Sequence, residues 1–179
     1  MNNFSRTTTE IRYTLTCRAA RIPFEKISQE ILPQRYVLSL VVCGDKLARR
    51  INRAYRVAPR SVAPRYQSGI LRSQFALLRQ GFAGFSSPSS SRKTPRYTAK
   101  EKKKDYSPNV LSFPLGEYEG EIFLNVRKAE REAKAAGISA RERVALLFIH
   151  GCLHLCGMKH GNMMEAEERR VLKRFGFRM

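Results

Sequence analysis

The residues best suited to chemistry in this chain are its histidines, because all three fall within eleven positions, at His150, His154 and His160. In a helix each residue turns by about 100°, so residues i and i+4 lie roughly 40° apart on one face. His150 and His154 can therefore offer two imidazoles to one metal ion. Gly157 lets the chain leave the helix and fold back, so that His160 can supply a third ligand. Three imidazoles leave a fourth tetrahedral position for water, which is typical of catalytic zinc.

The alternative is a pair of core histidines followed by one on the surface. The concentration of every histidine of the chain in one H-x3-H-x5-H pattern favours the metal site. Cys152 and Cys156 share this segment but lie about 160–200° from the neighbouring histidines around the helix axis, so we expect them to pack rather than bind the metal. The other two cysteines of the chain are Cys17 and Cys43. We expect all four to be buried and reduced, as in a protein of a reducing compartment.

The residue after the first histidine is Gly151, where zinc peptidases of the H-E-x-x-H type have a glutamate as general base. A peptidase of that type would lack its base. Zinc would then have to lower the pKa of its own water, to about 7 in favourable sites. Another group would have to stabilise the anionic transition state, and arginine suits phosphoryl oxygens.

The overall charge points to the class of partner. The chain has 34 Lys and Arg against 15 Asp and Glu, a net charge of +19 over 179 residues. A field of this sign attracts polyanions, most commonly nucleic acid, although a basic protein without such a partner is the alternative. With no long apolar run and no apolar leader in the first 21 residues, we expect a cytoplasmic protein without membrane contact.

The elements that must position the histidines follow from apolar periodicity and turn residues. The sequence predicts strands over residues 36–43, 109–114 and 121–126, and helices over 45–55, 127–136, 141–155 and 165–175. Asp45 is expected to cap its helix, and Ser139 with Glu142 has the spacing of a capping box before the central helix. The pattern predicts an α+β (α/β-like) fold, a small mixed sheet packed with helices, with the metal site at the central helix.

Residues 58–104 differ from the rest, because Ser and Pro are frequent there and eleven positive residues face one negative residue. We interpret them as an insertion within a single domain, 1–179, rather than as a second domain. Five aromatic residues are interspersed with the charges: Tyr66, Phe75, Phe82, Phe85 and Tyr97. Cations neutralise phosphates and aromatic rings stack on bases, so the insertion is expected to engage RNA at the rim of the site, with a solvated spacer as the alternative.

Four segments resemble a known family. The histidine segment, residues 150–160, resembles the H-G-x-L-H-L-x-G-x-D-H signature of the YbeY family of metal-dependent endoribonucleases. Residues 51–56 are similar to its L-N-x-x-Y-R, residues 109–114 to its D-V-L-S-F-P, and residues 120–122 to its G-D-I, in the same order along the chain. The resemblance implies a zinc-dependent endoribonuclease that cleaves single-stranded RNA in ribosomal RNA maturation, ribosome biogenesis and quality control.

The resemblance also assigns roles to residues. It implies one zinc ion per chain, bound by His150, His154 and His160, and it makes Arg56 and His150 the catalytic residues. The implied partners are small-subunit precursor RNA and a ribosome or ribosomal protein. Lys159, Asn109 and Glu121 depart from the family, which has Asp at each position. Lys159 leaves open a non-catalytic, zinc-stabilised RNA- or ribosome-binding factor, and a metal hydrolase of another class, such as a peptidase, is the further alternative.

Overall fold

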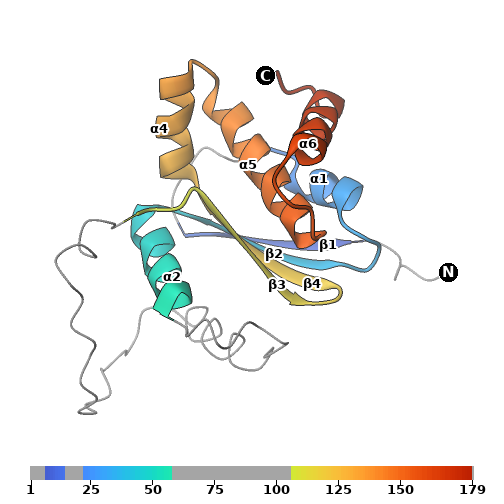
Figure 1. The fold of residues 1–179 in the computed structure, drawn as a ribbon, viewed down its shortest axis with the longest axis horizontal. Coiled ribbons are helices and arrows are strands. Elements are labelled where there is room, and N and C mark those ends of the chain that lie inside the picture. The colour runs from blue at the N-terminus through green and yellow to red at the C-terminus, as the bar shows by residue number, and fades with distance from the viewer. Residues whose placement is uncertain (1–6, 15–21, 58–105, 179) are drawn as a thin grey trace, which may run out of the picture. The chain divides into compact units, whose positions relative to one another are not determined.

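A computed structural model describes residues 7–14, 22–57 and 106–178, except for the side chains of residues 55–57. Its four strands are β1 (Thr8–Tyr13), β2 (Val37–Cys43), β3 (Val110–Gly116) and β4 (Glu119–Asn125). They form one sheet in the order β1-β2-β4-β3, in which β1, β2 and β4 are parallel and β3 is antiparallel to β4. The predicted small mixed sheet is thus confirmed (Figure 1).

Five helices accompany the sheet in the described part of the chain: α1 (Phe24–Ile31), α2 (Asp45–Val57), α4 (Val126–Ala136), α5 (Ala140–Leu155) and α6 (Asn162–Arg174). Strands and helices together make the predicted α+β fold. The predicted helices match within three residues at each end. None of the helices in these ranges is long and apolar enough to cross a membrane.

The core explains why β2 is almost entirely apolar. Leu38, Leu40 and Val42 are fully buried in the main core, which they share with α1, α4, α5 and α6. Helix α2 lies apart from these helices and contacts β3 and β4, and its Ala48 and Ile51 are buried outside the main core (Figure 1). Because helices cover the face of β2 that carries Leu38, Leu40 and Val42, this face needs no polar residues.

Helix α5 is the centre of the fold, because it contacts α1, α4, α6, β3 and β4. Its start is fixed by the predicted capping box, in which the Ser139 hydroxyl accepts from the Glu142 N–H at 3.1 Å and the Glu142 carboxylate accepts from the Ser139 N–H at 3.2 Å. Its middle is fixed by Phe148, which is 0% exposed and meets the Phe24 ring edge-on at 4.8 Å. Full burial of one such side chain contributes about 1.5–3 kcal/mol. The helix is therefore a rigid support for residues on its exposed face.

Three features differ from the sequence-based expectation. Strand β1 and helix α1 were not predicted. Asp45 is not a cap but lies in the first turn of α2, where its carboxylate accepts two hydrogen bonds from Arg131, at 2.8 and 2.9 Å. Cys156 is exposed rather than buried, because it follows the last residue of α5, whereas Cys43 and Cys152 are buried as expected. Cys17 and the insertion at 58–104 lie outside the described residues.

Candidate metal centre

The last turn of α5 brings two histidines together. His150 and His154 are one turn apart, their ring centroids are 4.5 Å apart, and their Nε2 atoms are 3.0 Å apart. Both are half-buried, so each ring has one side against protein and one side open. The helical spacing seen in the sequence therefore produces the expected pair.

His160 joins the pair through a turn that depends on glycine. Gly157 has φ of 81°, in the left-handed region that favours glycine, and the N–H groups of Gly157 and Met158 donate to the carbonyls of His154 and Leu153. This is the Schellman arrangement that ends many helices. The chain reverses, and the ring of His160 comes to lie 5.0 Å from His150 and 4.6 Å from His154, centroid to centroid.

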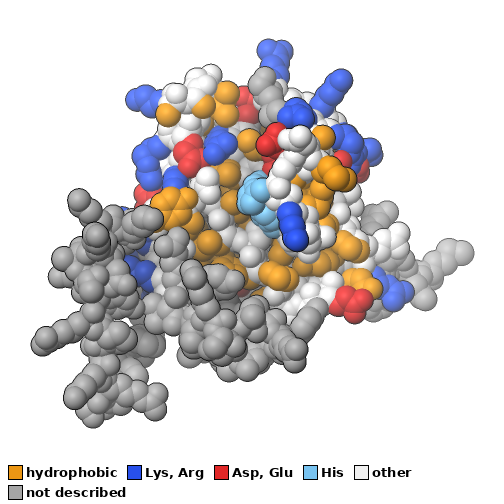
Figure 2. Space-filling model, viewed as in Figure 1, with side chains coloured by type: hydrophobic (Ala, Val, Ile, Leu, Met, Phe, Trp, Pro, Cys, Tyr) orange, Lys and Arg blue, Asp and Glu red, His pale blue; other side chains and the backbone are white. Residues whose placement is uncertain are grey.

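One nitrogen from each ring lies within 4.8 Å of the others. Ligands about 2.0–2.1 Å from a tetrahedral metal are about 3.3–3.4 Å apart, so the three rings need only small adjustments to share one ion. His160 is exposed, and Figure 2 shows the histidine side chains together at the surface. The cluster is thus accessible to a metal ion and to a substrate.

Hydrogen bonds determine which ring nitrogens are available. His154 Nδ1 lies 2.9 Å from the carbonyl oxygen of Met158, which can only accept, so this nitrogen carries a hydrogen. His150 Nδ1 lies 2.7 Å from Oε1 of Glu168, and a carboxylate likewise accepts. In neutral rings both Nε2 atoms then present lone pairs to each other across 3.0 Å.

Two lone pairs at that distance repel unless a cation lies between or beside them. A proton on one of the rings would serve in the same way, although burial lowers the pKa of His154 below its usual value, which disfavours a charge on that ring. A metal ion satisfies both nitrogens at once. The donor set, three neutral imidazoles with both α5 rings available through Nε2, therefore fits a zinc-type ion.

Gly151 follows the first histidine directly, but its Cα atom faces the sheet. A Cβ atom there would meet Ser112 Oγ at 3.0 Å, Ile122 Cδ1 at 3.1 Å and Val110 Cγ2 at 3.3 Å. There is no room for a glutamate side chain without moving the helix away from the sheet. The H-E-x-x-H chemistry is thus excluded at this position by packing as well as by residue type.

The remaining site predictions have different outcomes. The backbone of Arg56 belongs to the last turn of α2, but its side chain lies outside the described residues. Lys159 is exposed in the connection between α5 and α6, directly before His160. Cys152 and Cys156 are not among the side chains that converge with the histidines in the described part of the chain, although only Cys152 is buried as a packing residue.

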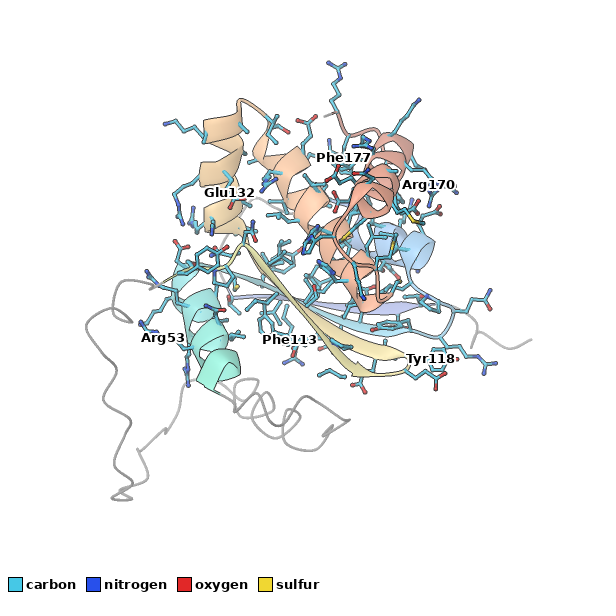
Figure 3. All side chains as sticks on the ribbon, viewed as in Figure 1. Arg53, Phe113, Tyr118, Glu132, Arg170 and Phe177 are labelled. Carbon is cyan, nitrogen blue, oxygen red and sulfur yellow. The ribbon has the colours of Figure 1, made fainter. Side chains whose placement is uncertain are left out.

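Two of the departures from the family pattern are explained by contacts away from the histidines. Asn109 Nδ2 lies 3.2 Å from both carboxylate oxygens of Glu132 on α4, the residue labelled in Figure 3. An aspartate could not donate these bonds and would repel Glu132. Glu121 is 2% exposed, and its carboxylate accepts from the Ser39 hydroxyl at 3.2 Å. Both residues link elements of the fold.

The contact between Glu168 and His150 was not predicted from the sequence. Glu168 lies on α6, eighteen residues after His150, and its side chain is 14% exposed. The sequence shows an acidic helix start with Glu165, Glu167 and Glu168 close together, and no periodic signal separates them. Only the packing of α6 against α5 reveals which of them reaches the histidines.

The chain is similar to known proteins over a region that includes the three histidines. The family model "Endoribonuclease YbeY" matches residues 90–176. An endoribonuclease YbeY of Campylobacter jejuni (strain RM1221) is 37% identical over 83 residues, covering 42% of this chain and 62% of the relative. The corresponding protein of Pseudomonas putida (strain W619) is 43% identical over 79 residues, covering 40% and 50%, and that of Geobacter sulfurreducens is 38% identical over 77 residues, covering 38% and 51%.

The matches therefore span between half and about three fifths of the length of these relatives. The matched region contains β3, β4 and the three helices that follow, and with them all three histidines. It also contains Glu168, Asn109 and Gly151. Over residues 90–176 the chain is similar to the endoribonucleases YbeY.

Proposed function

We propose that this chain is a zinc-dependent endoribonuclease that cleaves single-stranded RNA during maturation of small-subunit ribosomal RNA. The observation that carries the proposal is the convergence of His150, His154 and His160, with the Nε2 atoms of the first two 3.0 Å apart. The names of the homologous proteins support an RNA substrate. The charge of +19 supports a polyanionic one.

The residues of the chain would have separate roles in the reaction. His150, His154 and His160 would hold one zinc ion, with Nδ1 of the first two fixed by Glu168 and the Met158 carbonyl. Zinc bound by three imidazoles supplies an activated water and a Lewis acid for the phosphodiester. Arg56 would place its guanidinium against the phosphoryl oxygens, where a planar, permanently charged fork is suited to the developing charge. The positive surface would draw in the RNA backbone.

A non-catalytic RNA- or ribosome-binding factor is the second candidate, and Lys159 favours it. The resemblance implies an aspartate at position 159, next to His160. Unlike a carboxylate, the lysine at this position cannot accept a hydrogen bond from an imidazole. However, the structure gives Nδ1 of His150 and of His154 other acceptors, so two ligands are oriented without help from position 159. A peptidase is disfavoured because the base position is Gly151, which packs on the sheet.

The test is cleavage of a fluorescent single-stranded RNA oligonucleotide by the purified full chain. We expect cleavage in the presence of zinc, loss of cleavage after treatment with a chelator, and recovery when zinc is added back. A double-stranded RNA of the same sequence should be cleaved more slowly. RNA binding without cleavage in every metal condition would favour the non-catalytic factor, and casein digestion would favour the peptidase.

A further inference from the structure

Glu168 is a partly buried carboxylate with an unusual environment. Its side chain is 14% exposed, and its Oε1 atom is 2.7 Å from Nδ1 of His150. Its neighbours on α6 pair with arginines: Glu167 with Arg170 at 2.6 Å and Glu165 with Arg169 at 3.9 Å. In the described part of the chain no lysine or arginine pairs with Glu168.

A carboxylate in this position needs positive charge nearby. Partial burial removes water from the charge and is costly unless a cation or hydrogen-bond donors compensate. The imidazole of His150 donates one hydrogen bond, and a metal ion on the far nitrogen of that ring would add the missing positive charge through it. The environment of Glu168 is therefore explained by a cation on the other side of His150.

The packing of α6 holds Glu168 in place. Met164, Val171 and Leu172 are buried at 0–1% exposure, and they share one face of the helix with Glu168 at spacings of four, three and four residues. That face lies against α5, which carries His150. The carboxylate is thus supported by regular structure on both sides of the hydrogen bond.

We propose that Glu168 is a positioning residue of the metal centre. By accepting from Nδ1–H it selects the tautomer of His150 that directs Nε2 at the ion, fixes the plane of the ring, and makes the imidazole a stronger donor to the metal. The proposal rests on the metal site under "Proposed function", and it adds a residue on α6 to a site otherwise built from α5 and the turn after it.

The experiment measures zinc affinity of the full-length protein by competition with a chromophoric chelator. Glu168→Ala should bind zinc about 10–100-fold more weakly than wild type, since loss of such a partner typically has this effect. Glu168→Gln keeps an acceptor oxygen but loses the charge, so its affinity should lie between the two. Glu165→Gln is the matched control, because Glu165 lies on the same helix but its side chain is 62% exposed, and its affinity should equal wild type.

A second readout separates positioning from general stability. Nitrogen-15 NMR of the apo protein should show the hydrogen of His150 on Nδ1 in wild type and in Glu165→Gln, and a mixture of Nδ1–H and Nε2–H forms in Glu168→Ala. If Glu168→Ala keeps wild-type zinc affinity and the Nδ1–H form, the role of Glu168 is refuted while the metal site stands. If the wild-type protein itself binds no zinc, both the metal site and the role of Glu168 are refuted.

Discussion

The close approach of α5 to the sheet at Gly151 makes Gly151→Ala an informative change. The added methyl would lie 3.0–3.3 Å from Ser112, Ile122 and Val110, so the neighbours must give way by a few tenths of an ångström. Overpacking of this kind costs about 1–3 kcal/mol. Alanine in a helix interior is favoured over glycine by about 1 kcal/mol, which offsets part of that cost.

The expected net effect is a loss of about 1 kcal/mol in the free energy of unfolding, which corresponds to roughly 2–4 °C in Tm for a domain of this size. Denaturant titration followed by circular dichroism measures it. Ile122→Val removes the Cδ1 atom that lies 3.1 Å from the added methyl. In that background Gly151→Ala should be less destabilising, with a coupling energy of about 1 kcal/mol.

A gain in stability for Gly151→Ala would contradict the close approach of α5 to the sheet. If α5 did not approach the sheet closely at this point, helix propensity alone would make Gly151→Ala more stable by about 1 kcal/mol. The two accounts thus differ by about 2 kcal/mol, which denaturant titration resolves. If the effects of Gly151→Ala and Ile122→Val on the free energy of unfolding were simply additive, the proximity of Ile122 would also be contradicted.

Three further predictions concern other parts of the molecule. The pKa of the Asp45 carboxyl is held well below its usual range, mainly by hydrogen bonds from Arg131, so its stabilising effect is present above about pH 4 and is lost as pH falls below that. Asp45→Asn should therefore unfold at lower denaturant concentration than wild type at pH 7, and the difference should shrink on acidification; an equal difference at pH 7 and pH 3 would contradict this. Arg56→Ala should reduce the rate of RNA cleavage with little change in Tm, whereas wild-type cleavage would refute a role for Arg56. Replacing residues 58–104 by a short Gly-Ser linker should leave zinc binding intact and weaken RNA binding, and the slope of log K against log salt should become shallower by about 0.7 for each RNA phosphate that the variant no longer neutralises; unchanged affinity and slope would make this segment a spacer.

The sequence predicted the parts of the fold that depend on local pattern. The apolar run of β2, the Ser139–Glu142 capping box and the end of α5 before Gly157 all follow from short-range rules, and the structure shows each of them. Strand β1 was missed because its sequence, TTEIRY, is largely polar and its strand form depends on pairing with β2. Helix α1 has only eight residues, too few for a clear periodic signal.

In the candidate site, too, the local features could be predicted from the sequence and the contacts between elements could not. The spacing of His150 and His154 and the turn at Gly157 are local, so the convergence of the three rings could be predicted. The hydrogen bond between Glu168 and His150 could not, because it depends on how α6 packs on α5 after the turn. The fit of Gly151 against the sheet likewise depends on side chains from β3 and β4.

If His150, His154 and His160 form a metal centre, the purified protein should contain a bound metal ion, and its metal content can be measured. Elemental analysis after dialysis against zinc and removal of free metal should give one zinc per chain for wild type. His154→Ala, checked for folding by circular dichroism, should give far less than one, because two remaining imidazoles hold the ion weakly. A wild-type protein without zinc, or a His154→Ala variant that retains one zinc per chain, would contradict a metal centre at these histidines.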